Sequence, residues 1–304
     1  MTREAEFIDL IRPLAAAGAR GFADDAAVLE LGGATLVLTH DMIVEGVHFL
    51  PDDPPGDVAW KLVAVNLSDL AAKGARPVGA LLGFTLGDGE WDRAFAAGLA
   101  EALAHFELPL LGGDTVSAPV RALGLTAIGE AVGPVPSRSG AKPGDQLWVS
   151  GEIGGASAGL ALLAQGLAEP MSLIERYRRP EARLAAGGRL APYVSAMMDV
   201  SDGLLIDAAR MAAASGVSLL IDLSQVPLAP GVERSAAITG GDDYELLFTM
   251  PEAGGGFVHR LSDELGLPFA RIGVAAGGTG LALTEDGRPV PLPDRLGWEH
   301  RQPG

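Results

Sequence analysis

Cysteine is absent from the 304-residue chain. Its absence excludes disulfides, thiolate metal sites and a cysteine nucleophile, and it fits a reducing compartment. The N-terminus lacks the basic and then apolar pattern of a signal peptide, and no apolar run approaches the roughly 20 residues of a membrane span. We therefore expect a cytoplasmic protein.

Positive charge is also scarce, with 22 Lys and Arg against 39 Asp and Glu and a formal net charge of −17. This balance argues against nucleic acid or an anionic membrane as a partner, because both need a basic face. The only lysines are Lys61, Lys73 and Lys142, and no Gly-x-x-x-x-Gly-Lys-[Ser/Thr] sequence occurs. A P-loop is thereby excluded, so this chain would need metal ions to bind a polyphosphate.

The length predicts two domains, since domains most often have roughly 100 to 150 residues. The first half shows a helical pattern over 4–17, 57–73 and 91–106, and strand patterns over 26–31, 35–39, 42–47, 78–86, 108–111 and 122–132. Asp57 is the expected cap of the second helix, Gly74 its stop, and Val58, Leu62 and Val65 its core face. This pattern predicts an α+β N-terminal domain.

In the second half, helices near 181–190 and 203–214 alternate with strands near 217–222, 244–250 and 269–275, which predicts an α/β C-terminal domain. A turn at Lys142–Asp145 precedes a strand through Val149 and a helix that starts among the glycines of 151–159. The boundary is expected at Gly133–Pro136. The predicted domains are 1–136 and 137–304.

Aspartates recur in six segments where strands end or glycines turn: Asp24-Asp25, Asp41, Asp69, Gly112-Gly113-Asp114, Asp199–Gly203 and Gly240–Asp243. Mg2+ prefers oxygen ligands and is held by one or two carboxylates together with water and substrate phosphates. Several such segments in one acidic chain therefore predict a site with several Mg2+ ions that handles ATP.

Most of these segments also have a local interpretation. Asp69 could form only an exposed ion pair with Lys73, four residues along the helix. Ser201 or Asp202 could cap the helix that follows Gly203. Asp24-Asp25 and Gly112-Gly113 could be ordinary turns. It is their joint occurrence that favours the metal site.

The sequence pattern alone also leaves open the roles of several histidine, arginine and glycine residues. His48 fits a core histidine as well as a substrate contact, and His40 could bind metal or only flank Asp41. Arg138 could hold a phosphate or be a linker charge. The glycines of 151–159 could hold a phosphate at a helix N-terminus, although close packing is the commoner use of such glycines.

Seven segments in order resemble the thiamine-monophosphate kinase family, and the match runs through most of the chain. They are Phe22–Leu29, Val44–Phe49, Ala64–Ala72, Gly112–Thr115, Arg138–Asp145, Asp199–Leu204 and Asp243–Phe248. The resemblance implies a two-domain fold like that of aminoimidazole ribonucleotide synthetase. It also implies phosphorylation of thiamine monophosphate by ATP, and a homodimer that pairs through the N-terminal domains.

The resemblance assigns roles to individual residues of this sequence. It places Mg2+ on Asp25, Thr39, Asp41, Asp69, Asp114, Asp199 and Asp202, ATP on Gly113, Asp114, Arg138 and Ser201, and the thiamine phosphate on His48, Asp242 and Trp298. The family usually has Thr or Ser where His40 stands and Glu where Asp242 stands. It usually has an aromatic residue where Arg301 stands, so stacking on thiamine either falls to Trp298 or is absent. A requirement for K+ is left open.

Two other functions remain open. One is another ATP-using synthetase of the same fold, although the absence of cysteine argues against relatives that work through cysteine or selenocysteine. The other is a non-catalytic scaffold in which divalent ions only stabilise the fold. The reaction itself needs no strong base, because a phosphate monoester, with a second pKa of about 6, is already largely ionised at neutral pH.

Overall fold

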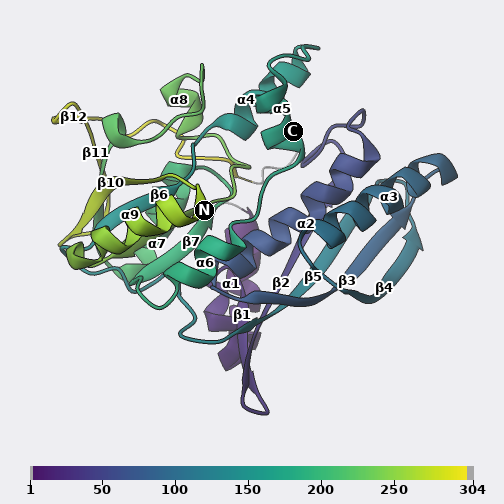
Figure 1. Cartoon of the computed structure of the whole chain (residues 1–304), viewed down its shortest axis with the longest axis horizontal. Helices are drawn as coiled ribbons and strands as arrows, with labels where there is room; N and C mark the ends of the chain where they lie inside the picture. Colours follow the sequence, from purple (N-terminus) through teal and green to yellow (C-terminus); the bar gives the residue numbers. More distant parts are fainter. Residues whose placement is uncertain (1–2, 300–304) are drawn as a thin grey trace.

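A computed structural model describes residues 3–299, which form two β-sheets side by side with helices packed on them (Figure 1). The N-terminal sheet has the strand order β1-β2-β5-β3-β4. Its strands are β1 (Ala27–Leu31), β2 (Ala34–Val44), β3 (Arg76–Leu86), β4 (Leu110–Ser117) and β5 (Ala122–Ala131). Only β3 and β4 pair in parallel, and the other pairs are antiparallel.

Helix α2 (Pro55–Ala72) joins the two halves of the molecule. It packs on β2, β5 and α3 (Gly89–His105) on the N-terminal side, and on α6 (Leu184–Leu190) and β7 (Ala196–Val200) on the C-terminal side. Every residue from Val58 to Ala72 is consequently buried, including the polar ones. The predicted core face of Val58, Leu62 and Val65 is confirmed, but the helix is buried on its other faces as well.

The C-terminal sheet has the order β12-β11-β8-β10-β6-β9-β7. Beside β7 its strands are β6 (Gln146–Ser150), β8 (Ser218–Asp222), β9 (Glu245–Met250), β10 (Phe269–Ala276), β11 (Gly280–Glu285) and β12 (Arg288–Val290). Leu147 and Val149 pack in one hydrophobic cluster with α7 (Leu204–Ser215), whereas Trp148 packs in another with α6 and α9 (Gly255–Leu265). This alternation follows from the two-residue period of a strand. Helices α4 (Gly155–Ala164), α5 (Met171–Arg178) and α8 (Arg234–Ala237) complete the C-terminal half.

The predicted fold class, an α+β N-terminal domain followed by an α/β C-terminal domain, is confirmed. Among the described residues, the strands of the second sheet pair antiparallel except for β8 with β11. Among residues 3–299, no helix combines the length and apolar character needed to cross a membrane. The domain boundary at residues 136 and 137 stays a prediction.

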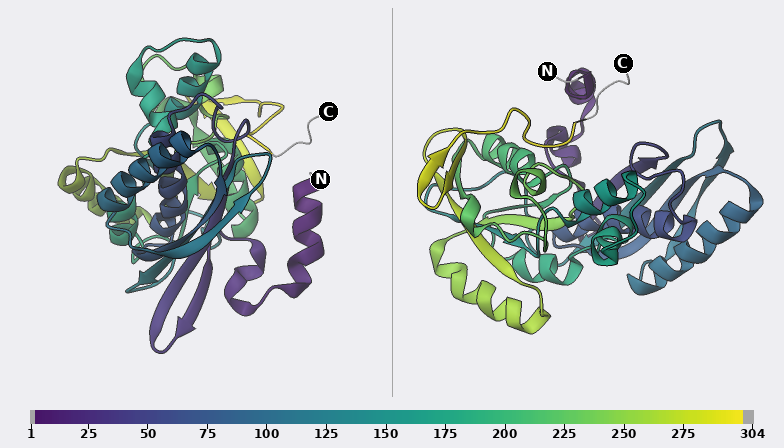
Figure 2. Two further views of the ribbon diagram at one scale, coloured as in Figure 1. Left: turned by 90° about the vertical axis from the view of Figure 1, so that its right-hand side faces the viewer. Right: turned by 90° about the horizontal axis from the view of Figure 1, so that it is seen from above.

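Several local predictions were wrong. Residues 42–47 are not a separate strand, because β2 continues to Val44 against β5. Asp57 does not cap α2, which begins at Pro55, a residue suited to a first turn; Asp57 instead pairs with Arg179 at 2.5 Å. The first helix, α1 (Arg3–Ile11), is shorter than predicted and is followed by 3-10 turns over Arg12–Leu14 and Ala17–Phe22. Figure 2 shows α1 standing away from both sheets.

Candidate functional site

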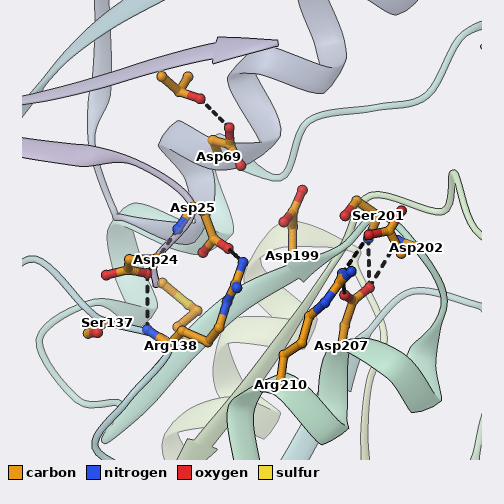
Figure 3. Close-up of polar contacts among 12 residues, drawn as sticks. Asp24, Asp25, Asp69, Ser137, Arg138, Asp199, Ser201, Asp202, Asp207 and Arg210 are labelled. Atoms are coloured by element: carbon orange, nitrogen blue, oxygen red, sulfur yellow. Dashed lines mark hydrogen bonds and ion pairs between the residues drawn. The ribbon is translucent and has the colours of Figure 1, made fainter. Parts of the chain in front are cut away.

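Three predicted metal ligands meet where the two halves of the chain join. Asp25 precedes β1, Asp69 lies on the last turns of α2, and Asp199 lies on β7. One carboxylate oxygen of each lies within 4.8 Å of the others (Figure 3). The sequence separation between them is large, so only the packing of α2 against both sheets brings them together.

Thr39 and Asp41 approach this group from β2. The Thr39 hydroxyl donates a hydrogen bond to the Asp69 carboxylate, and the backbone N–H of Asp41 donates to Asn66 Oδ1 at 2.9 Å. Residues two apart on a strand face the same side, so Thr39 and Asp41 face α2 together. Asn66 and Asp69 thus anchor β2 to the helix at the site.

The electrostatics of the carboxylates fit a cation site. Burial raises the pKa of Asp199 to about 8, and the charge of Asp25 adds to the rise. Burial also raises the pKa of Asp69 well above its ordinary value, with Asp41 and Asp199 adding to it, and raises that of Asp41 to about 6. Buried like charges disfavour ionisation, and a bound divalent cation would reverse the effect. The donor set, hard oxygen atoms from three carboxylates, suits Mg2+.

Asp24 and Asp25 are held by cations that the sequence did not link to them. Lys73, which is fully buried, places Nζ 2.5 Å from Asp24 Oδ1 and 2.6 Å from Asp25 Oδ2. Arg20 pairs with Asp24 at 2.6 Å, and Arg138 pairs with Asp25. Burial alone would raise the pKa of Asp24, but its cationic neighbours hold it below its ordinary value. The interpretation of Lys73 as the partner of Asp69 in an exposed pair is therefore wrong.

The loop after β7 is shaped by Asp207, which was not predicted. Its Oδ2 accepts hydrogen bonds from the backbone N–H groups of Ser201, Asp202 and Gly203 at 3.0 to 3.2 Å. Arg210 pairs with Asp202 at 2.5 Å and with Asp207 at 2.7 Å (Figure 3). The interpretation of Ser201 or Asp202 as the cap of α7 is wrong, because the helix begins at Leu204 and Asp207 reaches back from its first turn.

Gly112, Gly113 and Asp114 lie within β4, so the interpretation as an ordinary turn is wrong. A Cβ on Gly113 would lie 1.9 Å from the backbone oxygen of Leu82, which excludes any larger residue. Asp114 is exposed. Gly113 is level with Asp41 but three strands away, which is about 14 Å at roughly 4.8 Å per strand. The structure therefore does not bring Asp114 into the group of three carboxylates.

The predicted substrate contacts form a second cluster. The ring centroids of His48 and Trp298 are 6.0 Å apart, and His48 Nδ1 accepts the backbone N–H of Val44 at 3.1 Å. Lys61 Nζ donates to the His48 carbonyl oxygen at 3.0 Å and to Asp242 Oδ2 at 2.7 Å. His48 and Asp242, predicted from opposite halves of the chain, are thus joined by a buried lysine that the sequence analysis did not assign.

The other sequence candidates have different outcomes. His40 is exposed, with Nδ1 2.9 Å from the Thr126 hydroxyl of β5. Arg301 lies outside the described residues. The glycines of 151–159 serve packing, since a Cβ on Gly159 would lie 2.1 Å from the Leu173 backbone oxygen. The backbone N–H of Gly154 is already bound, at 2.8 Å, by Asp243.

Comparison with known proteins gives the class and then the family. Residues 23–131 match the family model "AIR synthase related protein, N-terminal domain", and residues 142–286 match the corresponding C-terminal domain. The chain is 37% identical to a thiamine-monophosphate kinase of Escherichia coli K12, over 97% of this chain and 96% of the relative. It is 40% identical to the one of Caulobacter vibrioides, over 96% and 88%.

Solved structures agree with this similarity. A structure described as AaThiL complexed with AMPPCP and TMP has a TM-score of 0.85 at 33% identity and covers 97% of this chain and 96% of that chain. The thiamine-monophosphate kinase of Stenotrophomonas maltophilia K279a has a TM-score of 0.78 at 36% identity, over 94% and 96%. The two matched domains define an AIR-synthase-related protein. Within that class, the chain belongs to the thiamine-monophosphate kinase family, a family of enzymes.

Proposed function

We propose that this enzyme transfers the γ-phosphoryl group of ATP directly to the phosphate of thiamine monophosphate and forms thiamine diphosphate and ADP. The observation that carries the proposal is the group of Asp25, Asp69 and Asp199 at the junction of the two halves, in a chain of this family. A phosphate oxygen of thiamine monophosphate attacks the γ-phosphorus, and the bond from that phosphorus to the bridging oxygen of ADP breaks. No covalent phosphoenzyme is required.

Several Mg2+ ions are part of this proposal. Asp25, Asp69 and Asp199 offer the oxygen ligands, with Thr39, Asp41 and Asp202 on the adjoining segments. Bound Mg2+ supplies charge neutralisation and alignment for the phosphoryl oxygens. K+ is a further candidate ion, and its requirement can be read from activity with and without K+.

The remaining residues bind and orient the two substrates in this proposal. Arg138 and the backbone around Gly113 and Ser201 contact ATP, with the guanidinium of Arg138 matching phosphate geometry. His48, Asp242 and Trp298 contact the thiamine phosphate. The two halves, 1–136 and 137–304, then contribute to one active site, which agrees with the contact of Lys61 with Asp242 and with the approach of Asp25 and Asp69 to Asp199.

The decisive experiment incubates purified protein with ATP and thiamine monophosphate, with and without Mg2+. We expect thiamine diphosphate and ADP in equal amounts only when Mg2+ is present. ADP release driven by another small substrate, with no thiamine diphosphate at saturating Mg2+, would assign the protein to another ATP-using activity of the fold. An absence of any ATP turnover would favour a scaffold that only binds divalent ions.

Mg2+ should stabilise the protein more at pH 8 than at pH 6. In the metal-free protein, Asp199 has a pKa of about 8, so between pH 4 and pH 8 the folded state holds a proton that the unfolded state has lost. Rising pH therefore lowers the stability of the metal-free protein, while it frees the carboxylates for the ion. A tenfold gain in affinity adds about 1.4 kcal/mol at saturating Mg2+, or roughly 2–4 °C in midpoint.

This pH dependence is measured by thermal unfolding at both pH values, with EDTA and with Mg2+. The control is a buffer without Ca2+ whose ionic strength matches that of the Mg2+ buffer. Screening of charges by salt alone does not depend on these carboxylates. Equal Mg2+-dependent shifts at pH 6 and pH 8 would contradict the proposed ligand set.

A homodimer through the N-terminal domains is also proposed. The outer strand β4 is exposed along its whole length, and apolar side chains on it and on β3 are exposed, including Leu81, Leu111 and Val116. Such an apolar sheet edge is a typical association surface. Light scattering on the purified protein measures the assembly.

A cytoplasmic location is proposed as well, and cell fractionation tests it.

A further inference from the structure

Lys61 is a buried cation that contacts three separate segments of the chain. Its side chain is 2% exposed, and Nζ lies 3.0 Å from the His48 carbonyl oxygen and 2.7 Å from Asp242 Oδ2. Nζ also lies 4.0 Å from the centre of the Tyr177 ring. These partners belong to the loop after β2, the loop before β9 and helix α5, so one side chain on α2 connects N-terminal and C-terminal segments.

Stability alone does not account for an ammonium group at this position. Removing a charged amine from water costs several kcal/mol, and apolar residues of similar size often serve buried positions equally well. Here a carboxylate, a carbonyl oxygen and an aromatic face surround the Lys61 ammonium, which orients each of them. The arrangement is therefore suited to holding geometry.

Asp242 is held in an unusual backbone conformation with its carboxylate fixed from two sides. Its φ is +69°, and that of Tyr244 is +51°, values that few residues other than glycine adopt. Lys61 holds Oδ2, and the Tyr244 hydroxyl donates to Oδ1 at 3.0 Å. The side chain of Asp242 is 27% exposed, so its carboxylate remains accessible from the site.

The loop before β9 also touches the metal-binding segment. The backbone N–H of Asp242 donates to the Ser201 carbonyl oxygen at 2.8 Å, and that of Tyr244 donates to Val200, also at 2.8 Å. A displacement of Asp242 would therefore shift the residues next to Asp199. The Lys61 contact thus lies between the two clusters of the site.

The loop that carries His48 is fixed at a second point by α5. Asp53 accepts the backbone N–H of Leu50 at 2.8 Å, the Tyr177 hydroxyl at 3.1 Å and Arg178 Nε at 2.8 Å. Tyr177 therefore contacts Lys61 with its ring and Asp53 with its hydroxyl. Lys61 and Asp53 together hold both ends of the segment from His48 to Asp53.

We propose that Lys61 is a positioning residue for the phosphate acceptor: it sets the spacing between His48 and Asp242, and thereby the affinity for thiamine monophosphate. This inference rests on the proposed function. Lys61 acts through its two partners, and its contacts tie the His48 segment of the acceptor site to Asp242.

The test substitutes Lys61→Met, which is one atom shorter, fills most of the same space and removes the charge. We expect the KM for thiamine monophosphate to rise at least tenfold, while the KM for ATP changes less than twofold. A purely structural role would affect both substrates alike. Asp242→Asn should give the same selective rise, and the double variant should be no worse than the poorer single variant, because the two residues act as a unit.

Calorimetric titration of thiamine monophosphate into the protein with AMPPCP and Mg2+ gives an independent reading of the same loss of affinity. Equal changes in both KM values, or unchanged values, would overturn the positioning role. If Lys61→Met does not fold, the KM values of Asp242→Asn are the test. Values like those of the parent would overturn the proposal. The parent enzyme distinguishes failure of the positioning role from failure of the proposed function. If the parent makes no thiamine diphosphate, the proposed function itself is refuted.

Discussion

Replacement of Asp199 by Asn is expected to lower kcat by about 10²- to 10³-fold, as loss of one directed charge-stabilising group does in other enzymes. Asp199 is buried, with a pKa raised to about 8 by that burial and by Asp25. The amide has nearly the same shape and can keep the Ser68 contact, seen at 2.6 Å to Oδ2. It removes a ligand for Mg2+ without leaving a cavity.

The stability of this variant distinguishes a ligand from a structural residue. Since the carboxylate is unfavourable in the metal-free protein, Asp199→Asn should not lower the thermal midpoint in EDTA, and it should abolish most of the Mg2+-dependent rise. Asp69→Asn and Asp41→Asn should also lower kcat and reduce the Mg2+-dependent rise of the thermal midpoint. Asp263→Asn, an exposed aspartate on α9, is the matched control and should keep the parent rate. Parent-like rates for the three site variants at high Mg2+ would refute the metal site.

Replacement of Lys73 by Met is expected to lower the free energy of unfolding by about 3–5 kcal/mol, the usual cost of removing one partner of a buried ion pair. Lys73 is fully buried and contacts Asp24 and Asp25 at 2.5 and 2.6 Å. Without the ammonium, Arg20 and Arg138 remain as the cationic partners of the two carboxylates.

Urea unfolding of the parent and the variant measures this effect. Lys142→Met makes the same chemical change at an exposed position and should stay within about 0.5 kcal/mol of the parent. Adding Asp24→Asn to Lys73→Met should recover part of the loss, because it removes one of the two buried negative charges. A loss below about 1 kcal/mol for Lys73→Met would show that the arginines alone neutralise the pair.

Much of the fold could be read from the sequence where local rules apply. Helices α2 and α3 and strands β1, β3 and β5 were predicted within a few residues, because periodicity and glycine stops act over short distances. Elements in the second half, such as α5, α9 and β11, were missed, since their sequences are short or rich in glycine and charge. The β4 segment was misjudged because its two glycines suggest a turn when only sequence neighbours are considered.

The candidate site shows the same division. The aspartates and their flanking residues were sufficient to predict a group of oxygen ligands that could hold a metal ion, because ligand chemistry depends on residue type. The assignment of Lys61, Lys73 and Asp207 was not accessible, since each acts on residues that only the fold brings near. For Asp207 the distance in sequence is short, but its backward reach to residues 201–203 depends on the conformation of Gly203, whose φ is +126°.

The sequence alone therefore determined the chemical character of this protein: an acidic chain without cysteine, with aspartates in ordered motifs that resemble those of thiamine-monophosphate kinases. Tertiary structure decided which of these aspartates share a site. Asp25, Asp69 and Asp199 converge because α2 is buried between two sheets, whereas Asp114 lies on an outer strand. The physical reason is that ligand type is a local property of a residue, while distance between ligands is set by packing across the whole chain.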